Sequence, residues 1–91
     1  MSIEVKKLKE GEFIVTVAEG DSSTKHRVTL DNEYYNKLTK GNITREELIK
    51  KSFEFLLRHE SKESILSSFD LRVISRYFPQ YENEIKKEIT A

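Results

Sequence analysis

The chain lacks several residue types on which common functional sites depend. Its 91 residues include no cysteine, no tryptophan, one proline and three glycines. Without cysteine it can form no disulfide framework, no thiolate nucleophile and no zinc ribbon. Because all three glycines fall in predicted turns, none is left for a loop that cradles a phosphate group. The composition therefore excludes disulfide scaffolds and offers no support for the common nucleotide-binding motifs.

Long apolar runs and an excess of charge are also lacking. The longest apolar runs, Phe13-Ile14-Val15 and Phe55-Leu56-Leu57, are far shorter than the roughly 20 residues that a membrane span needs. The first residues, Met1–Lys7, do not resemble a signal peptide, so we expect a cytoplasmic protein that binds no membrane. Sixteen basic and sixteen acidic residues give a net charge of zero. No overall field therefore draws the chain to nucleic acid or to a basic partner.

The first thirty residues carry the alternating pattern of β-strands. Apolar residues alternate along Ile3–Leu8, Phe13–Ala18 and His26–Leu30, and turn-forming residues surround Gly11 and Gly20. This pattern predicts an antiparallel meander that buries one face and leaves the other in water.

Helical signals follow the third strand. Asp31 is suited to cap a helix that ends near Lys40, before Gly41. Thr44-Arg45-Glu46-Glu47 matches a capping box, in which the threonine and the last glutamate satisfy each other's backbone amides. The apolar spacing that follows predicts a long amphipathic helix ending near His59.

The last third of the sequence is divided into short helical pieces. Ser61-Lys62-Glu63 can open one turn of helix, and Asp70 is suited to cap another. Tyr81, Ile85 and Ile89 form a stripe on a terminal helix, and this stripe docks either on its own core or on a second copy.

The order of these elements predicts the fold class. Strands are followed by helices, which is typical of α+β proteins. We predict one domain over residues 1–91, with a three-stranded antiparallel β-meander over 1–30. Four or five α-helices over 31–91 are expected to pack on one face of it.

No catalytic or metal-binding motif emerges from the titratable residues. His26 and His59 are the only histidines, and neither lies in a metal or nucleophile motif. Glu47, Asp31 and Asp70 are explained by helix capping. We therefore predict a non-enzymatic protein with no catalytic residue, no metal site and no cofactor.

One constellation has the order strand, short helix, long helix. Lys25–Leu30 is the strand, Asp31–Leu38 the short helix, and Gly41–Ile49 opens the long one. This order, over residues 25–59, resembles the ribbon-helix-helix family of dimeric DNA-binding proteins. The whole chain also resembles small prokaryotic proteins without an assigned function, through Ser52–Leu57, Ser64–Leu66 and Tyr77–Glu82.

The family resemblance implies particular DNA contacts. The strand would pair with its partner's strand and enter the major groove, so that Lys25, Arg27 and Thr29 read bases. Thr44 and the neighbouring amides at the start of the long helix would hold phosphate. The alternative is that Lys25 and Arg27 simply decorate the solvated face of the meander.

A second group of residues suggests a protein-binding surface. Arg72, Arg76, Tyr77 and Tyr81 lie close together in the sequence, and tyrosine and arginine are enriched at interface hot spots. The alternative is that the tyrosines lie at the edge of the core and the arginines are solvated. From these patterns we expect a non-enzymatic interaction or regulatory module that binds an unknown protein partner or self-associates as a homodimer. A dimeric ribbon-helix-helix-like DNA-binding regulator is the alternative.

Overall fold

Three strands joined by tight turns form the surface on which the rest of the chain folds. The computed structural model describes residues 1–90. In chain order the elements are β1 (Ser2–Lys9), β2 (Glu12–Glu19), β3 (Ser22–Thr29), α1 (Asn32–Thr39), α2 (Arg45–His59), a 3₁₀ turn η1 (Lys62–Ser64), β4 (Ser68–Asp70), α3 (Val73–Tyr77) and α4 (Tyr81–Thr90).

The predicted meander is confirmed. β1 pairs with β2 and β2 with β3, both antiparallel. Gly11 and Gly20 occupy the two connecting turns with positive φ angles of 74° and 60°, a conformation that glycine adopts without steric cost. The third strand begins at Ser22, four residues before the predicted start, because pairing with β2 continues into a polar stretch with no apolar alternation.

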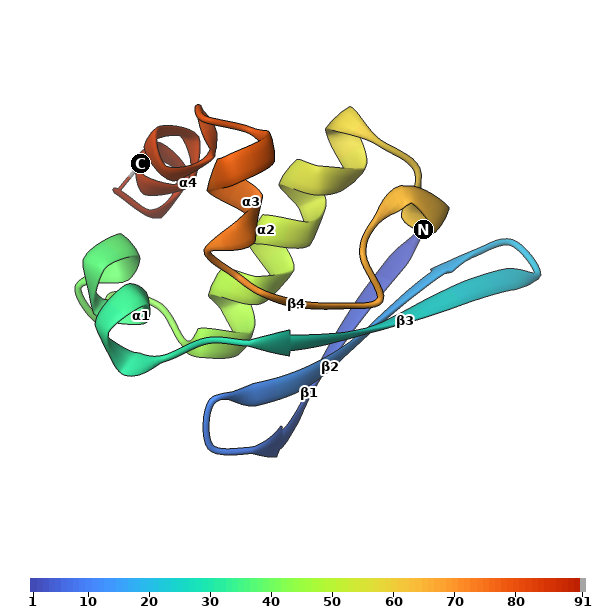
Figure 1. Cartoon of the computed structure of the whole chain (residues 1–91), viewed down its shortest axis with the longest axis horizontal. Coiled ribbons are helices and arrows are strands. Elements are labelled where there is room, and N and C mark those ends of the chain that lie inside the picture. Colours follow the sequence, from blue (N-terminus) through green and yellow to red (C-terminus); the bar gives the residue numbers. More distant parts are fainter. Residues whose placement is uncertain (91) are drawn as a thin grey trace.

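One face of the sheet is covered and the other is open. Phe13, Val15 and Val17 of β2 are completely buried, as is Val28 of β3, and all four point to the same face. The helices form a second layer on this side, with α2 lying across the sheet (Figure 1). We call this side the covered face and the opposite side the open face.

The prediction of three antiparallel strands is corrected by a fourth strand. β4 pairs with β3 in parallel, through Val28 opposite Phe69 and Thr29 opposite Asp70, so the sheet is mixed with the order β1-β2-β3-β4. A strand of three residues is too short to show an alternating pattern, and the local chemistry of Asp70 predicts a helix cap instead. In Figure 1 β4 runs beside β3 before the chain enters α3.

The first two predicted helices are confirmed, including their caps. The Asp31 carboxylate accepts a hydrogen bond from the Tyr34 amide at the start of α1. Thr44 and Glu47 form both hydrogen bonds of the capping box at the start of α2, which ends at His59 as predicted. The helix predicted to follow Asp70 is shorter than expected, because α3 spans only Val73–Tyr77.

The terminal helix docks on its own core. Tyr81 and Ile85 of α4 are completely buried within the same hydrophobic cluster as the strands, and Ile89 packs against that cluster. The sequence left open whether this stripe docks on its own core or on a second copy, and the structure shows that it docks on its own core. Within residues 1–90, no helix combines the length and the apolar character needed to cross a membrane.

The Gly11 turn provides a test of the close contact between the meander and the start of the helical layer. A Cβ atom at Gly11 would lie 3.3 Å from the Leu30 carbonyl oxygen, whereas one at Gly20 would meet nothing within 4 Å. Both glycines have positive φ angles, so alanine costs about 1 kcal/mol of stability at either position. We expect Gly11→Ala to lower the free energy of unfolding further than Gly20→Ala, as measured by urea denaturation. Equal losses would contradict the close contact.

Candidate functional site

An apolar groove opens between the end of α2, the segment before β4, and α3. We call it the α2–α3 groove. Its lining consists of Leu56, Glu60, Ser64, Ile65, Leu66, Phe69, Val73, Ile74, Tyr77 and Phe78. Its volume is about 190 Å³, and Glu60 is the one charged side chain among these ten residues.

Two side chains on the rim of the groove are unusually exposed for their type. Tyr77 exposes 67% of its surface and Leu66 48%. Beneath them Ile65, Ile74 and Leu56 are buried in the core, so the groove has a firm apolar floor. Exposed aromatic and aliphatic groups above such a floor can receive apolar side chains of another molecule.

A buried histidine holds the wall of the groove against the sheet. His26 of β3 is 2% exposed, and its Nδ1 lies 2.8 Å from the Leu66 carbonyl oxygen. Because a carbonyl can only accept, Nδ1 carries the proton and donates it. The other ring nitrogen lies 2.8 Å from the Thr24 hydroxyl. The hydrogen bond from His26 therefore fixes the position of Leu66, although the two residues are 40 positions apart in the chain.

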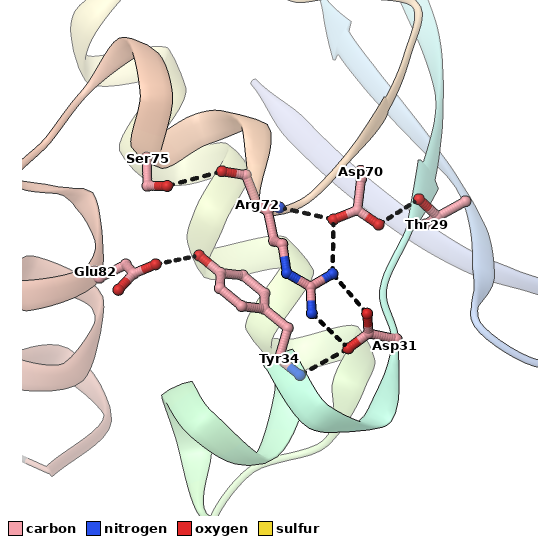
Figure 2. Close-up of polar contacts among 7 residues, drawn as sticks. All are labelled: Thr29, Asp31, Tyr34, Asp70, Arg72, Ser75 and Glu82. Carbon is pink, nitrogen blue, oxygen red and sulfur yellow. Dashed lines mark hydrogen bonds and ion pairs between the residues drawn. The ribbon is translucent and has the colours of Figure 1, made fainter.

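On the other side of α3, an ion-pair node joins four elements. Figure 2 shows the Arg72 guanidinium between Asp31 and Asp70, with the Tyr34 ring beside it. Arg72 donates two hydrogen bonds to the Asp31 carboxylate, at 2.5 and 3.1 Å, and lies 3.6 Å from Asp70. The guanidinium carbon is 4.9 Å from the centre of the Tyr34 ring. Asp70 in turn accepts from Thr29 of β3. We call this the Arg72 node.

A second set of contacts links the Arg72 node to α4. The Tyr34 hydroxyl donates to Glu82 at 2.8 Å, and the Lys37 ammonium lies 3.3 Å from the other oxygen of that carboxylate. Burial, and then the Glu82 acceptor, raise the pKa of Tyr34. Partial burial of Glu82 raises its pKa, but the hydrogen bond from Tyr34 and the nearby Lys37 outweigh this effect and hold the pKa below its usual value.

The structure separates the four residues predicted to bind a partner. Arg72 and Arg76 line one polar hollow of about 230 Å³, together with Lys37 of α1. Tyr77 lies on the opposite side of α3, in the α2–α3 groove. Tyr81 is completely buried, so its side chain cannot touch a partner in this structure.

A hydrogen bond inside the core explains how the polar hydroxyl of Tyr81 can be buried. Ser52 of α2 donates to the Leu48 carbonyl oxygen at 2.8 Å, so it accepts from the Tyr81 hydroxyl, 2.6 Å away. Burial raises the pKa of Tyr81 and keeps the hydroxyl protonated as the donor. The sequence pattern alone does not distinguish this internal contact from an external one.

The predicted DNA contacts are divided between two faces of the molecule. Lys25, Arg27 and Thr29 share the open face, because the residues between them, His26 and Val28, are buried on the covered face. Arg27 lies 3.1 Å from Glu12, and Thr29 donates to Asp70. Thr44 belongs to the helical layer on the covered side, where its hydroxyl caps α2.

The strand that carries these residues is paired with β2 along its whole length, and its last three residues, Arg27–Thr29, are also paired with β4. β3 has β2 on one edge and β4 on the other. A ribbon-helix-helix dimer instead needs this strand to pair with the same strand of a partner. Since β4 covers only Arg27–Thr29 of that edge, the pairing does not test the resemblance, and DNA binding stays a prediction.

The titratable side chains of residues 1–90 form no cluster suited to a metal ion. Within residues 1–90, no group of three or more His, Cys, Asp or Glu side chains is placed to hold a metal ion. His59 packs against both Phe55 and Phe78 with tilted rings, at centre-to-centre distances of 4.6 and 5.2 Å, and these two rings also contact each other. His59 and the buried His26 thus both have structural contacts.

The sequence patterns did not identify several of the groove residues as candidate site residues. Leu66, Phe69 and Val73 lie in a stretch where serines interrupt the apolar residues without a helical or a strand period. The one signal that could have identified them is that apolar residues occur in a segment without the spacing of an amphipathic helix. Such residues have no predicted place in the core.

The buried Tyr81–Ser52 contact predicts a defined loss of stability. Tyr81→Phe removes one hydrogen bond but leaves the Ser52 hydroxyl donating to Leu48, so we expect the free energy of unfolding to fall by about 1 kcal/mol. The exposed Tyr77→Phe is the control and should leave stability unchanged. Urea denaturation of both variants measures the difference, and equal stabilities would contradict the buried contact.

The Arg72 node predicts a pH-dependent contribution from Asp31. Hydrogen bonds from the Arg72 guanidinium and then from the Tyr34 amide hold the pKa of Asp31 below its ordinary value of 3.8. Because the folded-state pKa is depressed, this stabilisation is complete above the unfolded-state pKa and is lost as the pH falls through the folded-state value. Asparagine keeps the cap but carries no charge.

We therefore expect Asp31→Asn to be less stable than the parent at neutral pH and to approach it at low pH. Urea denaturation between pH 7 and pH 2 measures this gap. Asp21→Asn, in the exposed turn before β3, is the control and should show no such convergence. A gap that stays constant over the whole pH range would rule out the proposed contribution of the charged pair.

Comparison of the chain with protein-family models, curated protein sequences and solved structures found no match. Its function must therefore be inferred from its own geometry and chemistry. Two features bear on it: the apolar α2–α3 groove on one side of α3 and the polar Arg72 node on the other.

Proposed function

We propose that the protein is a non-enzymatic interaction module that binds a protein partner through the α2–α3 groove and also self-associates. The observation that carries this proposal is the exposure of Tyr77 and Leu66 above a buried apolar floor. Apolar surface of this kind gains free energy when a partner removes it from water, at roughly 25 cal/mol per Å².

The size of the groove favours a partner side chain over a small-molecule substrate. Its volume of about 190 Å³ lies below the roughly 300–1,000 Å³ that is typical of drug-sized ligand pockets. It exceeds an apolar cavity of about 150 Å³ that accepts benzene, so one aromatic or large aliphatic side chain fits. We therefore take the occupant to be an apolar side chain of a second protein.

The chemistry around the groove fits the same conclusion. One carboxylate, Glu60, stands in an otherwise uncharged lining, so there is no pair of titratable groups to share acid and base roles. Arg76 is exposed but lines the polar hollow on the opposite side of α3, so it adds no charge to the groove. Arg72 forms an ion pair with Asp31 and so contributes to the fold rather than to the groove.

Peptide selection with matched variants tests the groove. With the whole protein as bait, we expect selected peptides to contain aromatic or large aliphatic anchors. Tyr77→Ser or Leu66→Ser should weaken their binding by about tenfold or more, as measured by fluorescence anisotropy. Leu8→Ser is the control, because Leu8 is 49% exposed, like Leu66, but lies on β1 outside the groove.

Two outcomes would overturn the proposal. One is peptide binding that is equally weakened by Leu8→Ser, because the groove would then have no special part in it. The other is binding of duplex DNA that falls steeply with salt and is lost in Arg27→Ala, which would favour the DNA-binding alternative.

A further inference from the structure

The two edges of the sheet differ greatly in length. β4 covers only Arg27–Thr29 on one edge, so that among residues 1–90 the Ser22–His26 part of β3 has no strand partner there, whereas β1 forms the other edge with eight residues and pairs only with β2. A long edge strand presents a row of unpaired backbone donors and acceptors, which another strand can join. The opposite edge is interrupted where β4 begins, so neither its β3 part nor its β4 part offers as long a continuous row of such groups as β1.

The side chains of β1 favour one way of pairing with a second copy. Two β1 strands that meet antiparallel around a two-fold axis at Val5 place Val5 opposite Val5 and Glu4 opposite Lys6 twice. Glu4 and Lys6 are both exposed on the open face, where they face Thr16 and Ile14 of β2. Opposite charges directly across strands stabilise the pairing.

Neighbouring registers are disfavoured by the same residues. A shift by two residues in one direction places Glu4 opposite Glu4, and a shift in the other direction places Lys6 opposite Lys6. Like charges in directly opposite positions destabilise a strand pair. The register centred on Val5 is therefore the one with a long overlap and no like-charge pair.

We infer that the protein forms a homodimer by antiparallel pairing of β1 with β1, centred on Val5, which joins the two sheets into one continuous sheet. The inference deepens the self-association in the proposed function and rests on that part of it. On the covered face, the partly buried Val5 would meet Val5 of the second copy, and the partly buried Ile3 would lie opposite Lys7, whose aliphatic stem can cover it. The α2–α3 groove takes no part in this pairing and stays available to a different partner.

Charge reversal at the edge tests the register. Glu4→Lys and Lys6→Glu should each weaken the homodimer about tenfold or more, because each places like charges opposite each other twice. A mixture of the two variants should form a heterodimer, since every Lys at one position then faces a Glu at the other. Sedimentation equilibrium over a concentration series measures the dissociation constants.

A matched control separates this effect from overall charge. Lys25→Glu changes the net charge by the same amount as Lys6→Glu, but on the open face of β3, away from the edge. Lys25→Glu keeps the parent β1 edge, so it should dimerise with itself as the parent does. Mixed with Glu4→Lys, it should form a weaker heterodimer than Lys6→Glu does, because one of the two opposed pairs is then Lys opposite Lys. A heterodimer as tight as that of Glu4→Lys with Lys6→Glu would overturn the inferred register.

Cross-linking provides an independent measurement of the same geometry. The chain has no cysteine, so Val5→Cys introduces a single thiol at the two-fold axis. Opposed strand residues come close enough for a disulfide, whereas residues with Cα atoms more than about 7 Å apart do not. We expect mild oxidation to cross-link Val5→Cys into dimers and to leave Leu8→Cys, whose inferred neighbour is Ser2, uncross-linked.

The outcomes distinguish this inference from the groove proposal. A monomer at all concentrations, or a dimer unaffected by charge reversal and not cross-linked through Val5→Cys, overturns the β1 pairing. A dimer that instead dissociates in Tyr77→Ser locates self-association in the groove and also overturns it. Peptide binding in the groove is measured separately, so its failure leaves the result at β1 unchanged.

Discussion

The need to keep one face of the meander dry is the constraint on which the rest of the fold depends. Phe13, Val15 and Val17 are completely buried on the central strand, yet a sheet alone would leave them in water. Sheets of this size become stable when a second layer covers their apolar face. The helices supply that layer, and the buried faces of α2 and α4 meet the strands in one hydrophobic cluster.

The return path of the chain after α2 explains where the surface features lie. The segment after α2 crosses back to the sheet, adds β4 beside β3, and then turns into α3. His26 holds this segment on one side through the Leu66 carbonyl oxygen, and Arg72 holds it on the other through Asp31. Because α3 is short and stands between these attachments, one of its sides forms the groove and the other the polar node.

The α2–α3 groove and the β1 edge differ in their physical character. The groove is concave, apolar and lined by three late segments of the chain, so it suits the side chains of a different protein. The β1 edge offers backbone hydrogen bonds and alternating charges, so it suits a strand with a complementary pattern. Since they lie on different elements, occupation of one surface does not require the other to change.

The sequence by itself determined the elements that depend on local chemistry. Periodicity identified the three strands, and the Asp31 and Thr44 caps identified where α1 and α2 begin. These features arise from neighbours within a few residues, so their pattern is visible without the fold. The docking of α4, by contrast, was not determined by its apolar pattern. That pattern allowed α4 to pack either on its own core or on a second copy of the chain.

Only the tertiary structure decided the features that join distant segments. β4 exists because Phe69 meets Val28 from a distant part of the chain, and three residues carry no period of their own. Tyr81 and Tyr77 look alike in sequence, yet a buried serine on α2 receives one hydroxyl while the other tyrosine remains in the groove. Such choices depend on which surfaces meet after the chain has returned to the sheet, and that meeting is set by packing rather than by local propensity.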